Sequence, residues 1–406
     1  MDKKPEKLVP EVRFKGFTDD WEQHKLGEIS KRVRNNDGRM NLPLLTISAR
    51  YGWMTQQSRF SASIAGREKK NYTLLEKHQL SYNHGNSKVA IYGTVYELTD
   101  YDEALVPKVY HSFSLTPENL SKFIEAYFHT KKLDAQLGKF IASTARMDGL
   151  LNISFDDFMK VKLFAPEQCE QSKISRIINL IENLITLQQR KLEQLKQLKI
   201  FTLQRMFIDK DCKQPILRFK NFKDNWLPHK FNDIANTFSG GTPAISNKDY
   251  YGGNIPFIRS AEINKNTTQL HLTPDGLKNS SAKFIKKGTL LYALYGATSG
   301  EVGIAQIDGA INQAVMAITL KKDNVYFIKT WLIKNKRKII STYLQGGQGN
   351  LSAKIVKHLK LSLPKIEEEK LISITIMKID SLIKLQQSKI DDLVNLKKYL
   401  LQKLFI

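Results

Sequence analysis

Polar and aromatic side chains gather in two stretches of the chain, residues 31–105 and 237–310, and on one later loop. Arginine can form paired hydrogen bonds with guanine, and asparagine or glutamine with adenine, whereas serine, threonine and tyrosine more often bind the phosphate backbone. These stretches therefore hold the candidates for contact with nucleic acid, although polar loop residues can also be simply solvated. The candidates are Arg50, Tyr51, Trp53, Gln56, Gln57, Arg59, Tyr82, Asn83, His84, Asn86 and Lys88 in the first stretch, Ser239, Thr242, Arg259, Tyr292, Tyr295, Thr298 and Ser299 in the second, and Gln345 and Gln348 on the later loop.

Motifs that enzymes acting on nucleic acid normally carry are missing from this sequence. It has no G-x-x-x-x-G-K-S/T phosphate loop, no Asn-Pro-Pro-Tyr signature of amino-methyltransferases and no paired-histidine zinc motif. The GGQG run at Gly346–Gly349 lacks the spacing of a dinucleotide fingerprint. The acidic run Glu367–Glu369 falls in the first turn of an expected helix, where negative charge offsets the helix dipole. We therefore expect a non-catalytic chain with no metal and no cofactor of its own.

The overall charge favours a polyanionic partner. The chain of 406 residues carries 63 Lys and Arg against 40 Asp and Glu, a formal net charge of +23 spread along its length. Such a charge suits nucleic acid or an anionic membrane surface, but no window approaches the roughly 20 apolar residues that span a bilayer. For the basic run Lys334, Lys336, Arg337 and Lys338, phosphate contact and plain solvation are equally open.

The expected compartment is the cytosol. The first residues, MDKKPEKLVPEVRF, lack the apolar core of a signal peptide. Cys169 and Cys212 are too few for a disulfide framework and are wrongly spaced for zinc, so we interpret both as ordinary reduced thiols.

Much of the sequence occurs twice. The segment from Pro10 to Ile29 returns from Pro215 to Ile234 with ten identical positions, and the apolar segment ending at Ile208 returns as the one ending at Ile406. Trp21 and Trp226 lie beside matching phenylalanines, which favours core packing over stacking on bases. The middles, residues 31–105 and 237–310, differ in wording but both have short strand-like runs with glycine turns.

This duplication predicts an α/β (α+β) fold with two globular mixed-sheet domains and two long helices. We expect domains at residues 1–166 and 210–364, each followed by a long helix, at 167–209 and 365–406. A pseudo-two-fold axis should relate the two halves, and the variable middles should carry the specificity.

The long helices should pair as an antiparallel coiled coil. Apolar residues recur at steps of four and three, with Gln188 and Gln386 filling one gap in each seam. Each helix is about 55 Å long, so a parallel pair would have to stretch the six-residue linker DKDCKQ, which spans about 20 Å, along the whole helix. We hypothesise that Gln188 and Gln386 approach each other and fix the helix register; the alternative is a solvated gap in the seam.

With this duplicated plan and the segments given below, the chain closely resembles the specificity subunit of type I restriction-modification systems. The resemblance covers the whole chain. Its most specific local matches are SGGTPAISNKDYYGGNIPFIRSAEI and LLYALYGATSGEVGIAQIDGAINQAV in the second domain, LPLLTISARYGWM and YNHGNSK in the first, and LKKYLLQKLF near the end.

The resemblance implies a subunit that directs the catalysis of its partners. In that family each of two target-recognition domains reads half of an asymmetric bipartite DNA target, and the helices set the unspecified gap. Two methyltransferase subunits, using S-adenosylmethionine, and two restriction subunits, using ATP and magnesium, would bind this chain. The alternative is a free-standing bipartite DNA-binding or architectural protein without enzyme partners.

Overall fold

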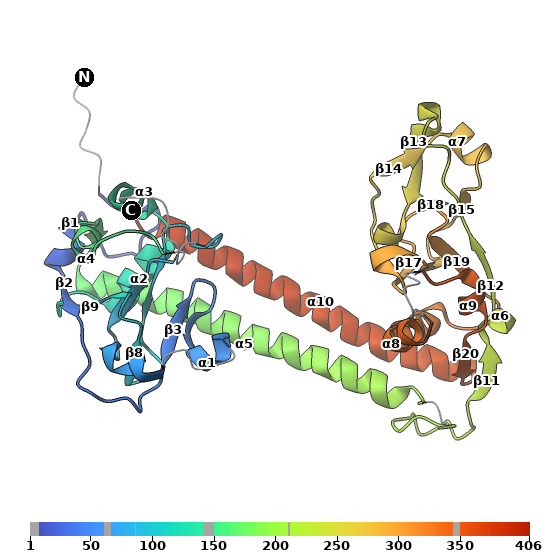
Figure 1. Cartoon of the computed structure of the whole chain (residues 1–406), viewed down its shortest axis with the longest axis horizontal. Coiled ribbons are helices and arrows are strands. Elements are labelled where there is room, and N and C mark those ends of the chain that lie inside the picture. The colour runs from blue at the N-terminus through green and yellow to red at the C-terminus, as the bar shows by residue number, and fades with distance from the viewer. Residues whose placement is uncertain (1–7, 61–65, 86, 142–149, 210–211, 344–349) are drawn as a thin grey trace. The chain divides into compact units, whose positions relative to one another are not determined.

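The computed structural model describes residues 8–60, 66–85, 87–141, 150–209, 212–343 and 350–406. The chain forms two compact units, and each unit contains parts of both long helices (Figure 1). Unit 1 comprises Met1–Arg190 and Gln387–Ile406, and unit 2 comprises Lys191–Gln386. The long helices are α5 (Gln168–Met206) and α10 (Ile366–Lys403), so each helix begins in one unit and ends in the other.

Unit 1 is built on a four-stranded antiparallel sheet in the order β2-β9-β6-β7. These strands are β2 (Ser30–Val33), β9 (His111–Leu115), β6 (Leu80–Asn83) and β7 (Thr94–Glu97). Two-stranded antiparallel ladders join β1 (Glu22–Lys25) to β10 (Lys162–Ala165), β3 (Leu45–Ser48) to β4 (Gly52–Thr55), and β5 (Thr73–Glu76) to β8 (Glu103–Val106). The short helices are α1 (Gln56–Phe60), α2 (Ser121–His129), α3 (Asp134–Phe140) and α4 (Phe155–Phe158), with 3-10 turns at Leu26–Glu28 and Gly66–Asn71.

Unit 2 repeats this frame with different additions. Its sheet β12-β19-β16-β17 contains β12 (Ala235–Ser239), β19 (Val315–Leu320), β16 (Leu290–Ala293) and β17 (Val302–Ile304). A second sheet, β14-β13-β18-β15, contains β14 (Leu270–Leu272), β13 (Tyr251–Ile258), β18 (Gly309–Ile311) and β15 (Lys283–Ile285), with β13 and β18 parallel. Strands β11 (Leu227–Lys230) and β20 (Lys360–Leu363) pair as β1 and β10 do. The helices are α6 (Phe231–Ile234), α7 (Pro274–Lys278), α8 (Val325–Tyr343) and α9 (Ala353–Lys357), with 3-10 turns at Lys248–Tyr250, Ser260–Glu262 and Gly296–Thr298.

The repeated segments of the sequence form the shared frame, and the expected fold class is confirmed. In both units the four-stranded sheet has the same order, and its last strand along the chain, β9 or β19, leads into a helix, α2 or α8. The units differ in what lies between these elements. Unit 1 adds the ladders β3-β4 and β5-β8, whereas unit 2 adds the mixed sheet around β13.

Each core contains one of the two tryptophans that the sequence predicts to be core residues, Trp21 in unit 1 and Trp226 in unit 2. Trp21 is 1% exposed and lies edge-on to Phe123 of α2, with ring centroids 5.7 Å apart. Trp226 is 3% exposed and meets Phe327 of α8 in the same geometry, again at 5.7 Å. Both tryptophans therefore pack in the core and are not platforms for bases.

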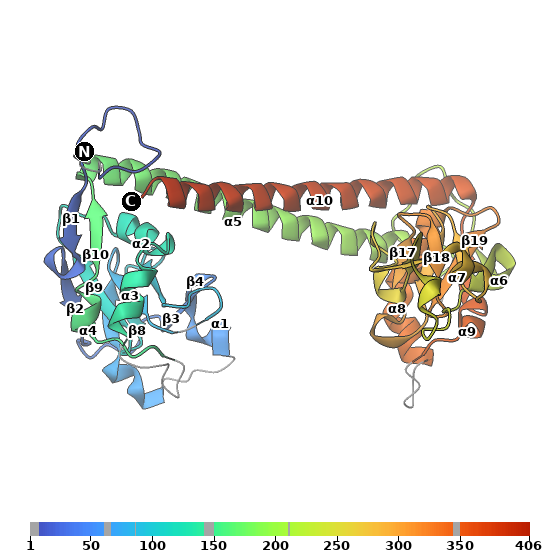
Figure 2. The ribbon, with the colours of Figure 1, turned by 90° about the horizontal axis from the view of Figure 1, so that it is seen from above.

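The end of a long helix completes each core. In unit 1, Phe405, just past α10, stacks on Phe123 at 5.2 Å, and α5 begins in the same core with Ile174. In unit 2, Phe207, just past α5, stacks on Phe327 at 4.9 Å, and α10 begins there with Ile372. Figure 2 shows the last turns of α10 beside the first turns of α5, next to α2.

Within each unit the two helices run antiparallel, as the sequence predicts. The start of one helix and the end of the other share one core, and Glu182 of α5 pairs with Lys397 of α10 in unit 1. Gln386 is buried and Gln188 is half-buried. They belong to different units, so their role in fixing the register stays a prediction.

A buried arginine-glutamate pair ties the opening segment of each unit to the start of its long helix. Arg13 donates two hydrogen bonds to Glu170, both at 2.8 Å, and Arg218 does the same to Glu368. Both glutamate side chains are 1% exposed. Bidentate hydrogen bonds hold the arginine and the glutamate in one relative geometry. They therefore fix the orientation of the opening segment of each unit against the start of its long helix.

The acidic run at the start of α10 does more than offset the helix dipole. Burial raises the pKa of Glu369 to about 8, although the carboxylate also accepts a hydrogen bond from the Asn324 amide at 2.7 Å. At the repeat-related position of unit 1, the neutral Gln171 accepts a hydrogen bond from the Leu120 amide at 3.0 Å. The fold thus accommodates an uncharged side chain at this position. Compensation of the helix dipole, which the sequence predicts for Glu367–Glu369, explains this run only in part, because two of its three carboxylates are buried.

Replacing Arg13 or Arg218 by Met should lower the free energy of unfolding by about 3–5 kcal/mol, because a buried glutamate then loses its cation. Chemical denaturation of the full-length chain measures this loss. Arg39→Met is the matched control, since Arg39 pairs with Glu103 at the surface, where solvent screens the pair. A control loss as large as the other two would contradict the structural role of the buried pairs.

The raised pKa of Glu369 predicts a pH dependence of stability. Its folded-state pKa of about 8 lies above the ordinary value of 4.5, so its contribution to stability is complete below pH 4.5 and is lost as pH rises toward 8. Glu369→Gln should remove this loss and leave the mutant more stable than the wild type at pH 8, with little difference at pH 4.5. Denaturation midpoints of both proteins across this range test the prediction, and parallel pH profiles would refute it.

Candidate nucleic-acid interface

The turn between β3 and β4 presents the most accessible of the predicted contact residues in unit 1. Arg50 and Tyr51 are both exposed, Tyr51 by 69%, and the Arg50 guanidinium lies 5.6 Å from the centre of the Tyr51 ring. Gly52 follows with φ of 70°, where a side chain would be strained, and a Cβ there would meet the Tyr96 ring at 3.1 Å. The turn is therefore held in a defined shape while its two side chains remain available to a ligand.

The rest of this hairpin is anchored to the domain. The Trp53 indole donates to the Glu97 carbonyl at 3.0 Å, and the Arg59 guanidinium donates to the Ile47 carbonyl at 2.6 Å. Gln56 is buried and bonds the Tyr72 hydroxyl, whereas its neighbour Gln57 is exposed. Of this group, Gln57 has the most freedom to contact a ligand.

The candidates at the end of β6 mostly serve the core. Tyr82 is fully buried, its ring stacks on Phe158 at 4.3 Å, and its hydroxyl donates to the Tyr92 carbonyl at 2.6 Å. Asn83 is half-buried and donates to the Ile47 carbonyl at 3.0 Å. Lys88 is exposed, and Asn86 lies outside the described residues.

His84 joins three segments of the domain. Its two ring nitrogens each lie 2.7 Å from a backbone carbonyl, Nδ1 from that of Leu151 and Nε2 from that of Val109. A carbonyl can only accept, so a ring nitrogen that carries the proton donates it to one of these carbonyls. This side chain, 5% exposed, therefore positions the loop instead of facing a ligand.

In unit 2 the candidates divide in the same way. Tyr292 is fully buried, and its hydroxyl has no hydrogen-bond partner among the described residues. Ser299 is buried and donates to the Leu294 carbonyl at 2.7 Å. Thr242 is exposed and donates to Gln313 at 2.6 Å. The remaining candidates are the half-buried Ser239, Tyr295 and Thr298, and Gln345 and Gln348, which lie outside the described residues.

Arg259 is held by an acidic partner. Its guanidinium lies 3.1 Å from the Glu262 carboxylate and also donates to Gln269 at 2.8 Å. The hydrogen bond that Arg259 donates to the Glu262 carboxylate raises the pKa of Arg259 above its ordinary value. A base contact by Arg259 would therefore compete with an existing ion pair.

The basic run on α8 is only partly available. Lys334 lies 3.3 Å from Asp209, and Lys336 pairs with Glu301. Arg337 and Lys338 are exposed. Phosphate contact is therefore easier for the second half of the run.

One cavity has the wrong charge for nucleic acid. It has a volume of about 750 Å³ and lies in unit 1 between the opening segment and the start of α5. Its acidic lining residues are Asp19, Asp20, Glu22, Glu28, Glu118, Glu167 and Glu170. These carboxylates would repel phosphate groups, so we expect the nucleic-acid contacts of unit 1 to lie on another part of its surface.

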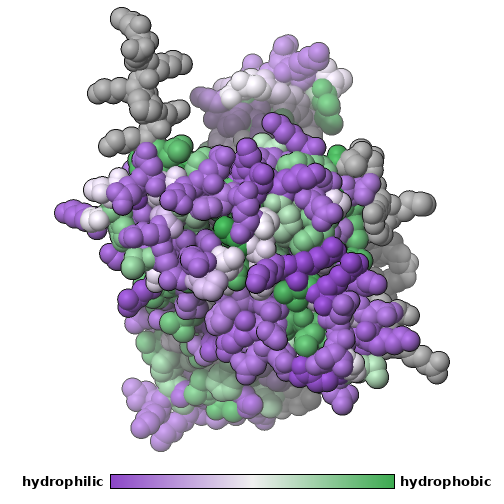
Figure 3. Space-filling model, turned by 90° about the vertical axis from the view of Figure 1, so that its left-hand side faces the viewer, coloured by the Kyte–Doolittle hydropathy of each residue, from purple (hydrophilic) through white to green (hydrophobic). Residues whose placement is uncertain are grey.

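The surface of unit 1 is mainly polar. Figure 3 shows one of its faces, on which hydrophilic residues predominate and apolar residues form small scattered spots. Among the described residues, the helices are all too short or too polar to cross a membrane.

Comparison with known proteins indicates one family. Residues 223–395 match the type I restriction modification DNA specificity domain. The MjaIX specificity subunit of a type I restriction enzyme from Methanocaldococcus jannaschii is 27% identical over 167 residues, which are 38% of this chain and 38% of that protein. A second protein of that organism, the putative MjaX specificity subunit, is 25% identical over 257 residues, which are 60% of this chain and 57% of that protein. The alignments thus span less than two thirds of either relative.

The fold has counterparts among solved structures. The crystal structure of a type I restriction-modification S subunit from M. genitalium superposes with a TM-score of 0.63, covering 98% of this chain and 99% of that one. Their sequence identity is 13%, so this likeness concerns the fold alone. The matches in sequence make this chain similar to the specificity subunits of type I restriction-modification systems, the family that its sequence resembles.

Proposed function

We propose that this chain is the DNA-recognition subunit of a type I restriction-modification complex. Each of its two globular domains reads one half of an asymmetric, bipartite DNA target. The chain carries out no catalysis itself but directs adenine-N6 methylation and ATP-dependent cleavage by its partners. The observation that carries this proposal is a shared frame with two unlike additions, the β3-β4 and β5-β8 ladders in unit 1 and the sheet around β13 in unit 2.

The unlike additions support two unlike half-sites. Base readout depends on the side chains that reach the groove, and the exposed Arg50 and Tyr51 turn has no repeat-related copy in unit 2. The shared frame would attach both domains to the long helices in the same way. A protein reading a palindrome would instead carry two similar reading surfaces.

The long helices support a role in binding partners. Apolar side chains that are 36–69% exposed recur at matching positions of the two helices. These pairs are Leu184 and Leu382, Leu187 and Leu385, Leu198 and Leu396, and Phe201 and Tyr399. Each unit receives one member of every pair, so unit 1 and unit 2 expose matched sets.

Matched apolar sets suit two copies of one partner. In unit 2 a groove of about 540 Å³ on α10 is lined by Ile374, Met377, Leu382 and Leu385, among others. Exposed apolar residues at helical spacing are a surface on which an amphipathic helix docks. We assign these surfaces to two methyltransferase subunits, with two restriction subunits joining the assembly through them.

The cofactors of the proposed reactions belong to those partners. S-adenosylmethionine, ATP and magnesium would bind the methyltransferase and restriction subunits, because the sequence of this chain has no motif for any of them. The long helices would set the unspecified gap between the two half-sites.

The alternative is a DNA-binding or architectural protein that uses the same two domains alone. It predicts the same DNA target but no enzyme partner. The exposed apolar sets on α5 and α10 favour the first function, because such surfaces in water are usually covered by another protein.

Exchanging residues 31–150 or 237–350 with those of a relative should change one half of the methylated site and leave the other half intact. Each addition belongs to one domain, so its contacts with bases move with it. Methylation maps of cells that express each chimera measure this outcome. A chimera that alters both halves, or neither, would show that the division of labour is wrong.

Substituting Leu382 and Leu385 together by Ser should release one methyltransferase subunit, and Leu184 and Leu187 together should release the other. Each buried leucine contributes about 1.5–3 kcal/mol, so each change weakens binding about tenfold or more. Light scattering of the purified complexes gives the number of partners bound. Lys196→Ser, an exposed position on α5, is the matched control. Retention of two partners by both double mutants would count against these surfaces.

A further inference from the structure

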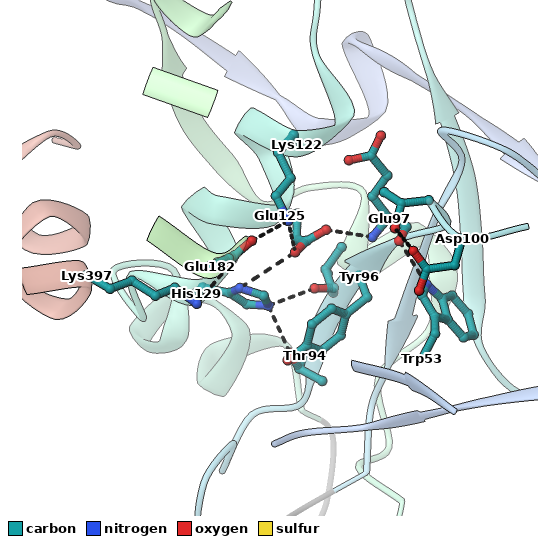
Figure 4. Close-up of polar contacts among 12 residues, drawn as sticks. Trp53, Thr94, Tyr96, Glu97, Asp100, Lys122, Glu125, His129, Glu182 and Lys397 are labelled. Atoms are coloured by element: carbon teal, nitrogen blue, oxygen red, sulfur yellow. Dashed lines mark hydrogen bonds and ion pairs between the residues drawn. The ribbon is translucent and has the colours of Figure 1, made fainter. Parts of the chain in front are cut away.

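A polar cluster joins three helices in unit 1. Glu182 of α5 pairs with Lys122 of α2 and with Lys397 of α10, each at 2.8 Å (Figure 4). Lys122 also reaches Glu125 at 2.9 Å. Because α2 belongs to the globular domain, these contacts connect that domain to both long helices at one point.

Unit 2 contains a corresponding cluster with different hydrogen-bond donors. We call the cluster around Glu182 the joint of unit 1 and the cluster around Asp380 the joint of unit 2. Asp380 of α10 accepts a hydrogen bond from the Tyr326 hydroxyl of α8 at 2.5 Å and pairs with Lys199 of α5 at 2.6 Å. In the helix repeat Asp380 corresponds to Glu182, and Lys199 to Lys397. Tyr326 precedes Phe327 as Lys122 precedes Phe123, so all three partners occupy related positions. A carboxylate bridging one domain helix and two long helices has thus been retained in both units, although its donors differ.

The joint of unit 1 continues into the domain. The Glu125 carboxylate accepts a hydrogen bond from the Glu97 amide of β7 at 2.9 Å, and the Glu97 carbonyl accepts one from the Trp53 indole at 3.0 Å. Trp53 lies on β4, directly beyond the turn that exposes Arg50 and Tyr51. A continuous series of contacts therefore leads from the long helices to Trp53, which follows the exposed turn in the chain (Figure 4).

The cluster is charged and internally balanced. Burial opposes the charge of Glu182, but Lys122 and Lys397 hold its pKa below the ordinary value. Burial likewise opposes the charge of Lys122, and Glu125 and Glu182 raise its pKa above the ordinary value. Both groups stay ionised, so the contacts are directional charge-assisted hydrogen bonds.

A metal ion is the competing explanation for this cluster. Ligand atoms of Glu125, His129 and Glu182 lie within 4.8 Å of one another. Two lysine ammonium groups already neutralise the carboxylates, and His129 Nε2 lies 3.0 Å from the Val95 carbonyl, to which it donates. A divalent cation would have to displace both lysines, so the geometry favours an ion-pair joint.

We propose that Glu182 and Asp380 are positioning residues that hold each recognition domain at a fixed orientation on its helices, and that they thereby determine which gap length the protein accepts. This inference rests on the proposed function. It assigns no base contact to either residue. Loosening a joint should let a domain tilt on its helices, so that half-sites one base pair nearer or farther, about 3.4 Å, come within reach. The bases read by each domain should stay the same.

The test is selection of sites from a randomised duplex DNA library by the full-length chain, purified with the methyltransferase subunits that accompany it. The variants are Glu182→Gln in unit 1, and Asp380→Asn and Tyr326→Phe in unit 2. Tyr326→Phe removes a single oxygen atom and keeps the fold testable if a carboxylate variant does not fold. Glu193→Gln is the matched control, because Glu193 is an exposed carboxylate on α5 that bonds only Gln197 within its own helix in the described structure.

The wild type and Glu193→Gln should select one gap length. The joint variants should select gaps longer or shorter by one base pair at least about tenfold more often, with unchanged half-sites, and Lys397→Arg, which preserves the ion pair, should behave as the wild type. A structural role alone would change the melting temperature but not the gap distribution. A single gap in every folded variant, or altered half-sites, would overturn the inference while leaving the proposed function standing. A wild type that selects no two-part site would overturn the proposed function, and this inference with it.

Discussion

A phenylalanine just past the end of a long helix stacks on the aromatic core of each domain and completes that core. Phe405 stacks on Phe123 beside Trp21, and Phe207 stacks on Phe327 beside Trp226. Because α5 begins in unit 1 and ends in unit 2, and α10 does the reverse, neither core is complete without the other half of the chain. The antiparallel course of the helices within each unit follows directly from this requirement.

A frame fixed in this way leaves the additions free to differ. The shared sheet, the aromatic core and the arginine-glutamate pair at the start of each long helix recur in both units, whereas the strands around them do not. The polar joints at Glu182 and Asp380 mount each domain on its helices with different donors. Under the proposed function, divergence in the additions would alter which bases are recognised, while the shared frame would attach both domains to the helices in the same way.

The sequence predicts this frame well because its signals are local and repeated. The seam residues Ile174 and Ile372 are buried, and the tryptophans lie in the cores as expected. The contact residues could not be sorted in the same way. Tyr82, His84 and Tyr292 have the chemistry of DNA-binding residues but are buried. Tyr82 and Tyr292 face inward from the paired strands β6 and β16, and His84 contacts the Leu151 and Val109 carbonyls. The joint around Glu182 could not be predicted from the sequence, because its members come from three separated helices that only the fold brings together.

We propose that two unlike domains read two unlike half-sites across a fixed gap. The most direct measurement is a hydroxyl-radical footprint of the assembled protein on the site that its host methylates. It should show two protected segments of different sequence, with centres about one helical turn, roughly 34 Å, apart and with less protection between them. One continuous protected segment, or two segments of the same sequence, would contradict the account.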